Sequence, residues 1–311
     1  MTRIAFAAFA ALLAASALAA PAPAIAPGGP LVGTIRDART GATLTSDALA
    51  DRIAAADVVL LGERHDNPDH HALQAWAIAE AAEDAVDGRL VLEMVRGNED
   101  APLADARPRD VPNLGEALRW EARGWPDYGM YAPILSVALE AGWEAVGGDA
   151  ARAELADPLG AGDAERARLG LDRPLPAAAA ARMERAIVEG HCDLLPAEAV
   201  PAFVAAQRLR DARMADALLE AAGRPAVLIA GAGHVGAEGV PFYLDARAPG
   251  RDVLSIAFVE APADARDPAA LMETFGDAAA AYDVVWFTAP VERGDVCAAL
   301  RERFGAGGHG G

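Results

Sequence analysis

Six short, mostly apolar segments constrain the fold of this chain more than any other feature. They span residues 58–61, 90–92, 143–146, 226–230, 252–260 and 283–289. Unbroken apolar runs of this length are typical of strands that are buried on both faces of a sheet. Sequence between the runs predicts helices near residues 47–56, 68–86, 113–123 and 131–142. The alternation predicts an α/β fold with a largely parallel or mixed central sheet and helices on both faces.

The first 20 residues have the pattern of a secretory signal peptide. Arg3 gives a positive start, Ile4–Leu13 an apolar core, and Ala17–Ala19 small residues for cleavage. Beyond them we predict a Pro/Ala/Gly-rich linker over residues 21–32, a single domain over 33–304 with a helical insertion near 150–222, and a disordered Gly-rich tail over 305–311. The mature protein is therefore expected in the periplasm or outside the cell.

Charge and cysteine content narrow the class of protein further. The net charge is −19, and an acidic chain repels phosphate backbones, so nucleic-acid binding is not expected. No later segment reaches the length of a membrane span, and no cysteine near the cleavage position offers a lipid anchor. Outside the cytoplasm, Cys192 and Cys297 either form one disulfide or remain two buried thiols.

Two similar turns at strand ends supply the main candidate site. The turns Gly62–His65 and Gly231–His234 both follow the pattern Gly-x-x-His, and a third predicted strand ends at Glu93. In open α/β sheets, ligands bind beyond the carboxyl ends of the strands. Glycine lets the chain turn sharply there, and histidine offers a ligand or a base near neutral pH.

These residues fit a metal site or a hydrolytic site. His65, His234 and Glu63 form a set that could hold a divalent metal ion. In a hydrolase, Glu63 or Glu93 would act as the general base on bound water. A lone histidine after a strand is usually an ordinary surface residue, but two such turns beside a carboxylate favour a site. Whether the protein is an enzyme stays open at this stage.

The helix expected after Pro68 places two histidines in its first turn. Adjacent helical residues point about 100° apart, so His70 and His71 cannot easily face one metal ion. His70 shares a face with Gln74 and is a candidate member of the site. His71 is expected to be exposed or paired with a neighbour.

The helix expected near residues 198–221 carries polar residues on or beside an apolar stripe. These residues are Gln207, Arg210 and Asp211. A buried charge must be paired or functional, so a structural Arg–Asp pair and a role in the site are equal alternatives. His191 precedes this helix and is a further candidate for the surroundings of the site.

The densest aromatic cluster spans Trp125–Tyr131. A tyrosine phenolate can ligate ferric haem, and tryptophan and methionine can pack against a porphyrin. Tyr128 and Tyr131 are therefore candidate haem ligands, although packing in the core is the simpler role for Trp125.

Several of these motifs, in this order, resemble the ChaN family of iron-regulated, haem-binding uptake proteins. That family belongs to a superfamily with the Tiki and TraB proteins and the erythromycin esterases. The resemblance runs from about residue 40 to 260. The matching segments are Gly62–Pro68, His70–Gln74, Leu92–Met94, Gly124–Ile134, His191–Pro196, Gln207–Ala215 and Gly231–Val235.

The resemblance implies an EreA/ChaN-like fold and a haem-binding protein of a haem or iron uptake system, in some members a dimer with stacked haems. An outer-membrane uptake receptor is the implied partner. The implied haem-binding residues are Tyr128, Tyr131, His70, Arg64 and Arg210, the arginines meeting the propionates. A supporting pocket would be formed by Gln74, Gln207, Asp211 and His191.

The Tiki branch implies a different function, a metal-dependent peptidase. Its paired Gly-x-x-His elements and a glutamate match this chain at Glu63, His65, Glu93, Arg210 and His234. A third interpretation is a non-catalytic partner of an outer-membrane receptor, with a vestigial site.

Overall fold

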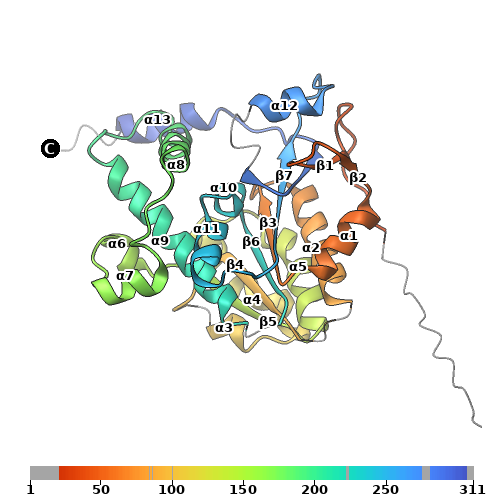
Figure 1. The fold of residues 1–311 in the computed structure, drawn as a ribbon, viewed down its shortest axis with the longest axis horizontal. Helices are drawn as coiled ribbons and strands as arrows, with labels where there is room; N and C mark the ends of the chain where they lie inside the picture. Colours follow the sequence, from red (N-terminus) through yellow and green to blue (C-terminus); the bar gives the residue numbers. More distant parts are fainter. Residues whose placement is uncertain are drawn as a thin grey trace, which may run out of the picture.

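The computed structural model describes residues 21–306, except 84, 86, 100, 222, 223 and 275–280. The expected signal peptide, residues 1–20, and residues 307–311 of the expected tail lie outside the described residues. One open eight-stranded sheet forms the centre of the molecule (Figure 1). Its strands are β1 (Ile35–Asp37), β2 (Thr43–Leu44), β3 (Val58–Glu63), β4 (Arg89–Arg96), β5 (Glu144–Asp149), β6 (Ala226–Gly231), β7 (Val253–Glu260) and β8 (Val284–Thr288).

The strands lie in the order β2-β1-β8-β7-β3-β6-β4-β5. The pairs from β8 to β5 are all parallel, whereas β1 pairs antiparallel with both β2 and β8. The fold prediction of a largely parallel, mixed sheet is confirmed. The short β1–β2 hairpin at the edge was not among the predicted strands, because its two or three residues carry no clear apolar run.

Helices cover both faces of the sheet (Figure 1). The helical segments are α1 (Ser46–Ala55), α2 (Pro68–Ala82), α3 (Ala101–Ala104), η1 (Pro108–Asp110), α4 (Val111–Ala117), η2 (Glu121–Arg123), α5 (Tyr128–Glu140), α6 (Arg152–Ala156), α7 (Asp163–Leu169), α8 (Ala177–Gly190), α9 (Val200–Leu219), α10 (Ala232–Val235), α11 (Val240–Arg247), α12 (Pro268–Thr274) and α13 (Val296–Ala306). The helical insertion expected near residues 150–222 corresponds to α6–α9. No helix in the described part of the chain is long and apolar enough to cross a membrane.

Alternate residues of each central strand enter different cores, because successive side chains of a strand point to opposite faces. Val59 and Leu61 of β3 pack with α1, α2 and α5 in one buried cluster. Val58 and Leu60 pack with α9 and α11 in the other. Both cores need apolar residues, and this explains the unbroken run at residues 58–61.

The helix predicted over residues 113–123 is interrupted. α4 ends at Ala117, and Arg119 follows in a left-handed backbone conformation with φ of 54°. An α-helix cannot continue through such a residue, so the chain turns and resumes as the short 3₁₀ segment η2. A non-glycine residue at this position is uncommon, because glycine is the usual residue just beyond a helix end.

The ends of the domain extend beyond the expected boundaries. Leu31, inside the expected linker, is 3% exposed and packs in a third apolar cluster with Phe287. α13 continues through Ala306, past the expected boundary at residue 304. Cys192, in the turn between α8 and α9, forms a disulfide with Cys297 of α13. Of the two alternatives for the cysteines, the structure therefore has the disulfide.

Candidate functional site

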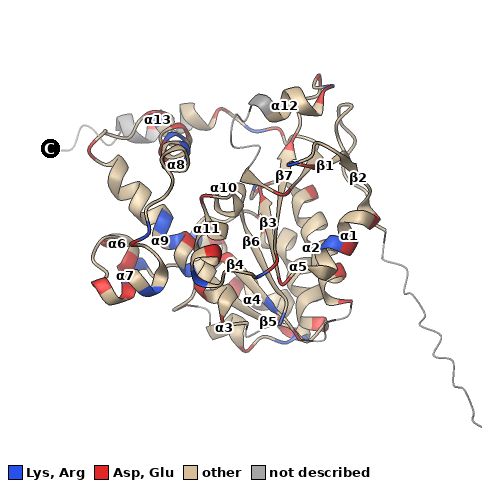
Figure 2. Cartoon of the chain, viewed as in Figure 1, with Lys and Arg blue, Asp and Glu red and all other residues tan. Residues whose placement is uncertain are grey.

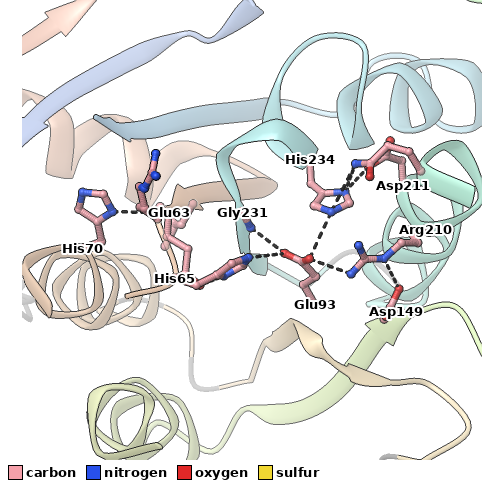
Figure 3. Close-up of polar contacts among 12 residues, drawn as sticks. Glu63, His65, His70, Glu93, Asp149, Arg210, Asp211, Gly231 and His234 are labelled. Carbon is pink, nitrogen blue, oxygen red and sulfur yellow. Dashed lines mark hydrogen bonds and ion pairs between the residues drawn. The ribbon is translucent and has the colours of Figure 1, made fainter. Parts of the chain in front are cut away.

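Three neighbouring strands end at one edge of the sheet and deliver polar groups to it. β3 ends at Glu63, β6 at Gly231, and Glu93 lies near the end of β4. Because β3, β6 and β4 are adjacent and parallel, their carboxyl ends meet at the same edge. Figure 3 shows the side chains of this edge together with those that α9 and α10 add to it.

The glycines of the two Gly-x-x-His turns let the turns pack against each other. A Cβ atom on Gly62 would lie 2.4 Å from Val235 Cγ2 and 3.0 Å from Ala232 Cα, both in the second turn and its helix. A Cβ atom on Gly231 would lie 3.2 Å from His65 Nε2 of the first turn. Each glycine therefore makes room for the other turn. Close packing of the two turns thus explains why glycine begins both motifs.

Glu63 is the centre of a buried group at the first turn. Its carboxylate accepts hydrogen bonds from His65 Nδ1 and from the hydroxyl of Tyr131, both at 2.8 Å. His71 Nδ1 lies 3.0 Å from the other oxygen. Burial alone would raise the pKa of Glu63, but hydrogen bonds from the two histidines outweigh it and lower that pKa to about 2. Glu63 is therefore a carboxylate at any ordinary pH.

Glu93 is the centre of a second buried group. It accepts hydrogen bonds from the backbone N–H of Gly231 at 2.7 Å and from Arg210 Nη2 at 2.8 Å. His234 Nε2 lies 3.2 Å from the same carboxylate. Arg210 also donates from Nε to Asp149 Oδ1 at 2.7 Å. Despite burial, the positive charges of His234 and Arg210 hold the pKa of Glu93 well below its ordinary value.

His234 lies between two buried carboxylates. Its Nδ1 is 2.5 Å from Asp211 Oδ1, and the carboxamide of Gln207 is 2.9 Å from the same nitrogen. Burial would lower the pKa of His234, but Glu93 and Asp211 together raise it to about 10. The imidazole is therefore a buried cation whose two N–H groups point at acids. The expected Arg–Asp pair is replaced by other partners, because Arg210 binds Glu93 and Asp149 whereas Asp211 binds His234.

The two groups approach each other at His65. Its Nε2 lies 3.9 Å from Glu93 Oε2, and its side chain is 32% exposed, against 6% for His234. Burial lowers the pKa of His65, but the hydrogen bond to Glu63 and the charge of Glu93 raise it overall. His65 is thus an accessible imidazole that can exchange a proton with a ligand.

The expected metal set is not assembled in this structure. Glu93, rather than Glu63, lies between the two histidines, and both nitrogens of His234 face carboxylates. Both ring nitrogens of His234 are thus engaged by carboxylates, Nδ1 by Asp211 at 2.5 Å and Nε2 by Glu93 at 3.2 Å. Within the described residues, no group of three or more His, Cys, Asp and Glu side chains could hold a metal ion. The metal-ion alternative therefore has no support from the structure.

Of the residues expected to meet haem, Tyr131 and His70 are buried and Tyr128 is half-buried. Tyr131 is fully buried against Glu63, and the Tyr128 hydroxyl donates to Val111 O at 2.7 Å. His70 Nδ1 accepts from the backbone N–H of Arg64, and its Nε2 lies 2.8 Å from Thr288 Oγ1. Burial lowers the pKa of His70 to about 4. His70 thus holds the backbone of the first turn, whereas His71, expected to be exposed or paired with a neighbour, is buried and paired with Glu63.

A cavity of about 420 Å³ opens beside the first turn, and we call it the apolar cavity. Arg64, with 61% of its side chain exposed, lies at it together with Glu63 and His65. The rest of its lining is Ala232, Phe258, Val259, Glu260, Met272, Tyr282 and Val285. Arg210 lies in a different cavity, so the two arginines expected to share one ligand are separated.

Three of the four residues expected to support the pocket contact a histidine of the site, and the fourth does not. Gln207 and Asp211 contact His234, and Gln74 Oε1 lies 3.2 Å from His71 Nδ1. His191, in contrast, hydrogen-bonds Ile187 O and packs its ring on Phe203, so its interactions lie at the α8–α9 turn.

Among the site residues that were not predicted, Asp149 had a signal in the sequence and Tyr282 had none. Asp149 ends a strand segment that the sequence does show, and its carboxylate binds Arg210. Tyr282 of the apolar cavity precedes β8 and lies in no motif.

Comparison with known proteins places the chain in a family. The family model described as "Haem-binding uptake, Tiki superfamily, ChaN" matches residues 49–244, which is more than half of the chain. A search of curated proteins finds no match.

A solved structure of a ChaN protein shares the fold. A structure described as cofacial haem binding to ChaN of Campylobacter jejuni is 20% identical, with a TM-score of 0.61, covering 81% of this chain and 95% of that chain. The type III effector HopBA1 is 16% identical, with a TM-score of 0.46, and the match covers 87% of this chain and 99% of that chain. The chain belongs to the haem-binding uptake family of the Tiki superfamily, ChaN.

Proposed function

We propose that this protein binds haem in the apolar cavity, as part of a haem or iron uptake system outside the cytoplasm. Membership of a haem-binding uptake family is the observation that carries the proposal. The disulfide between Cys192 and Cys297 supports the location, because disulfides persist in oxidising compartments and are rare in the cytosol.

The lining of the apolar cavity suits a flat apolar ring that carries carboxylates. Its walls include Phe258, Met272 and Val285, which can pack on a macrocycle. Its volume of about 420 Å³ lies within the range of small-molecule sites. Arg64 is 4.0 Å from Glu260 and largely exposed, so its guanidinium is free to pair with a propionate.

Tyr282 is the residue of this cavity best suited to hold the iron. Its hydroxyl makes a long hydrogen bond of 3.2 Å to Ala232 O, and burial raises its pKa to about 12. Ferric haem takes a tyrosine phenolate as an axial ligand and would displace that proton. Tyr128 and Tyr131 remain predictions, but each would first have to break a shorter hydrogen bond within the protein.

The test is a titration of the purified mature protein with haemin, followed through the Soret band. We expect a saturable shift, altered in position by Tyr282→Phe and weakened by Arg64→Ala. Tyr128→Phe is the matched control and should leave the spectrum unchanged, because its hydroxyl faces Val111. No saturable shift would overturn haem binding. A shift changed by Tyr131→Phe or Tyr128→Phe alone would overturn the ligand assignment only.

A further inference from the structure

The second cavity at the carboxyl edge of the sheet is lined by five arginines. It has a volume of about 690 Å³ and lies at the ends of β4 and β5, beside α9. We call it the arginine pocket; its arginines are Arg96, Arg119, Arg123, Arg152 and Arg210. Figure 2 shows basic residues on α9, with acidic residues on the same helix and residues of both kinds elsewhere in the chain. All 27 basic residues of the chain are arginines.

The acids of the arginine pocket do not balance its arginines. Glu99 pairs with Arg123 at 2.7 Å and with Arg96 at 3.4 Å, and Asp149 pairs with Arg210. Within the part of the chain that the structure describes, Arg119 and Arg152 have no acidic partner. In a chain of net charge −19, a concave surface with excess positive charge attracts anions by focusing the local field.

Two further details indicate a surface kept for a ligand. Arg119 occupies a left-handed position beyond α4, where glycine would relieve the strain on the backbone. Backbone strain of this kind persists mainly where the side chain is needed. The Nε atom of Arg96 is buried and has no hydrogen-bond partner among the described residues. The pocket thus holds an unused buried donor as well as two cations without acidic partners.

We propose that the arginine pocket binds a small polyanion, a molecule with two or more carboxylate or phosphate groups. A guanidinium presents paired N–H donors that match such oxyanions in bidentate geometry. Arg119 and Arg152, which are both exposed, bind separate oxyanion groups of one ligand. A monoanion engages at most part of this set and binds more weakly.

The arginine pocket adjoins the buried groups of the site without sharing the apolar cavity. Trp125 lines it and packs edge-on against the His65 ring, with centroids 5.0 Å apart. Arg210 connects it to Glu93 at 2.8 Å. The polyanion site does not depend on haem, so its test uses no haem.

The experiment is isothermal titration of the full mature protein with citrate, pyrophosphate and acetate at low ionic strength. We expect saturable binding of citrate or pyrophosphate and none of acetate at the same concentrations. The preferred polyanion shows whether carboxylate or phosphate groups are recognised. Arg119→Gly and Arg152→Ala should each weaken binding about tenfold, since each removes a charge-assisted contact. Binding should also weaken steeply with added salt.

Two controls separate loss of binding from loss of fold. Arg109→Ala removes an arginine with 83% of its side chain exposed, close in sequence to Arg119 and outside the pocket. It should leave the affinity unchanged. Arg119→Gly should raise or preserve the unfolding free energy, because glycine accepts the left-handed backbone. No saturable heat with either polyanion, or equal weakening by Arg109→Ala, would overturn the proposal.

Discussion

The turns Gly62–His65 and Gly231–His234 share a sequence pattern, a place at adjacent strand ends and a reciprocal packing contact. Their histidines nevertheless differ in exposure and in the number of carboxylates that they contact closely. His65 is 32% exposed and bonded to one carboxylate, whereas His234 is buried between two and carries a charge. The difference comes from α9, which brings Asp211 and Arg210 to the second turn. One motif thus produces an accessible imidazole in one place and a structural cation in the other.

Removing the carboxylate at the centre of the second group should have the largest effect. Glu93→Ala leaves the buried His234 cation and the half-buried Arg210 with one acid fewer, which should lower the unfolding free energy by about 3–5 kcal/mol. Glu99→Ala is the matched control, because Glu99 also bridges two arginines but is 38% exposed. Its cost should stay below about 1 kcal/mol. Urea denaturation measures both, and equal costs would contradict the distinction between the two carboxylates.

The charge on His234 should make stability fall at alkaline pH. Its pKa is about 10 in the folded protein and about 6.5 unfolded, so its contribution is complete below pH 6.5 and is lost as pH rises through 10. Between pH 7 and 9 the unfolding free energy should fall by at most about 1.4 kcal/mol per pH unit. The chain has no lysine, so few other groups titrate in this window.

Two variants attribute this slope to one residue. His234→Gln should remove most of the slope, whereas His65→Gln should retain it. Urea denaturation at pH 7, 8 and 9 measures the slope in each protein. If His234→Gln left the slope intact, the buried imidazole would not be charged.

Substitution of Gly62 should disrupt the close packing between the two turns. Gly62→Ala places a Cβ atom 2.4 Å from Val235 Cγ2, and such overpacking should cost about 1–3 kcal/mol. Gly233→Ala is the control within the second turn, because a Cβ atom there meets nothing within 4 Å. Thermal unfolding compares the two variants. A Gly62→Ala protein as stable as the parent would show that the turns do not depend on close contact.

The smallest effect is expected at the accessible histidine. His65→Ala removes one donor from Glu63, but His71 and Tyr131 remain and water can enter, so the cost should be about 1 kcal/mol. His234→Ala should cost several times more, because it leaves Glu93 and Asp211 buried without their shared cation. If both variants lost the same unfolding free energy in a denaturation experiment, the proposed difference between His65 and His234 would be wrong.

The central strands and the polar residues at their ends could be predicted from the sequence. Buried parallel strands are continuous apolar runs, and the turns that follow two of them begin with glycine. It did not reveal which face α2 turns to the site. His70 and His71 each have a plausible spacing to Gln74, and only the docking of α2 on the sheet places His71 beside Glu63. The sequence left Asp211 and Arg210 between a mutual pair and a role in the site, because their actual imidazole and carboxylate partners lie on distant strands and helices.

The arginine pocket was even less predictable from the sequence than the buried groups of the site. Its arginines come from β4, α6, α9, η2 and the turn after α4, and only Arg119 and Arg123 among them are close in sequence. In a chain with arginines throughout, their convergence follows from strand order and from the break at Arg119. Tyr128 and Tyr131 lie on a helix whose buried face packs in a core, and this packing too depends on residues distant in sequence.

The bond between Cys192 and Cys297 closes a covalent ring, because 105 positions separate the two residues. α9, the second turn and β8 lie within this ring, whereas the first turn lies outside it. A protease that cuts one peptide bond inside the ring opens it without releasing a fragment. A nicked molecule therefore keeps Asp211 and His234 joined to the strands that carry Glu63 and Glu93. In a compartment rich in proteases, the bridge lets the molecule survive a single cut as one covalent unit.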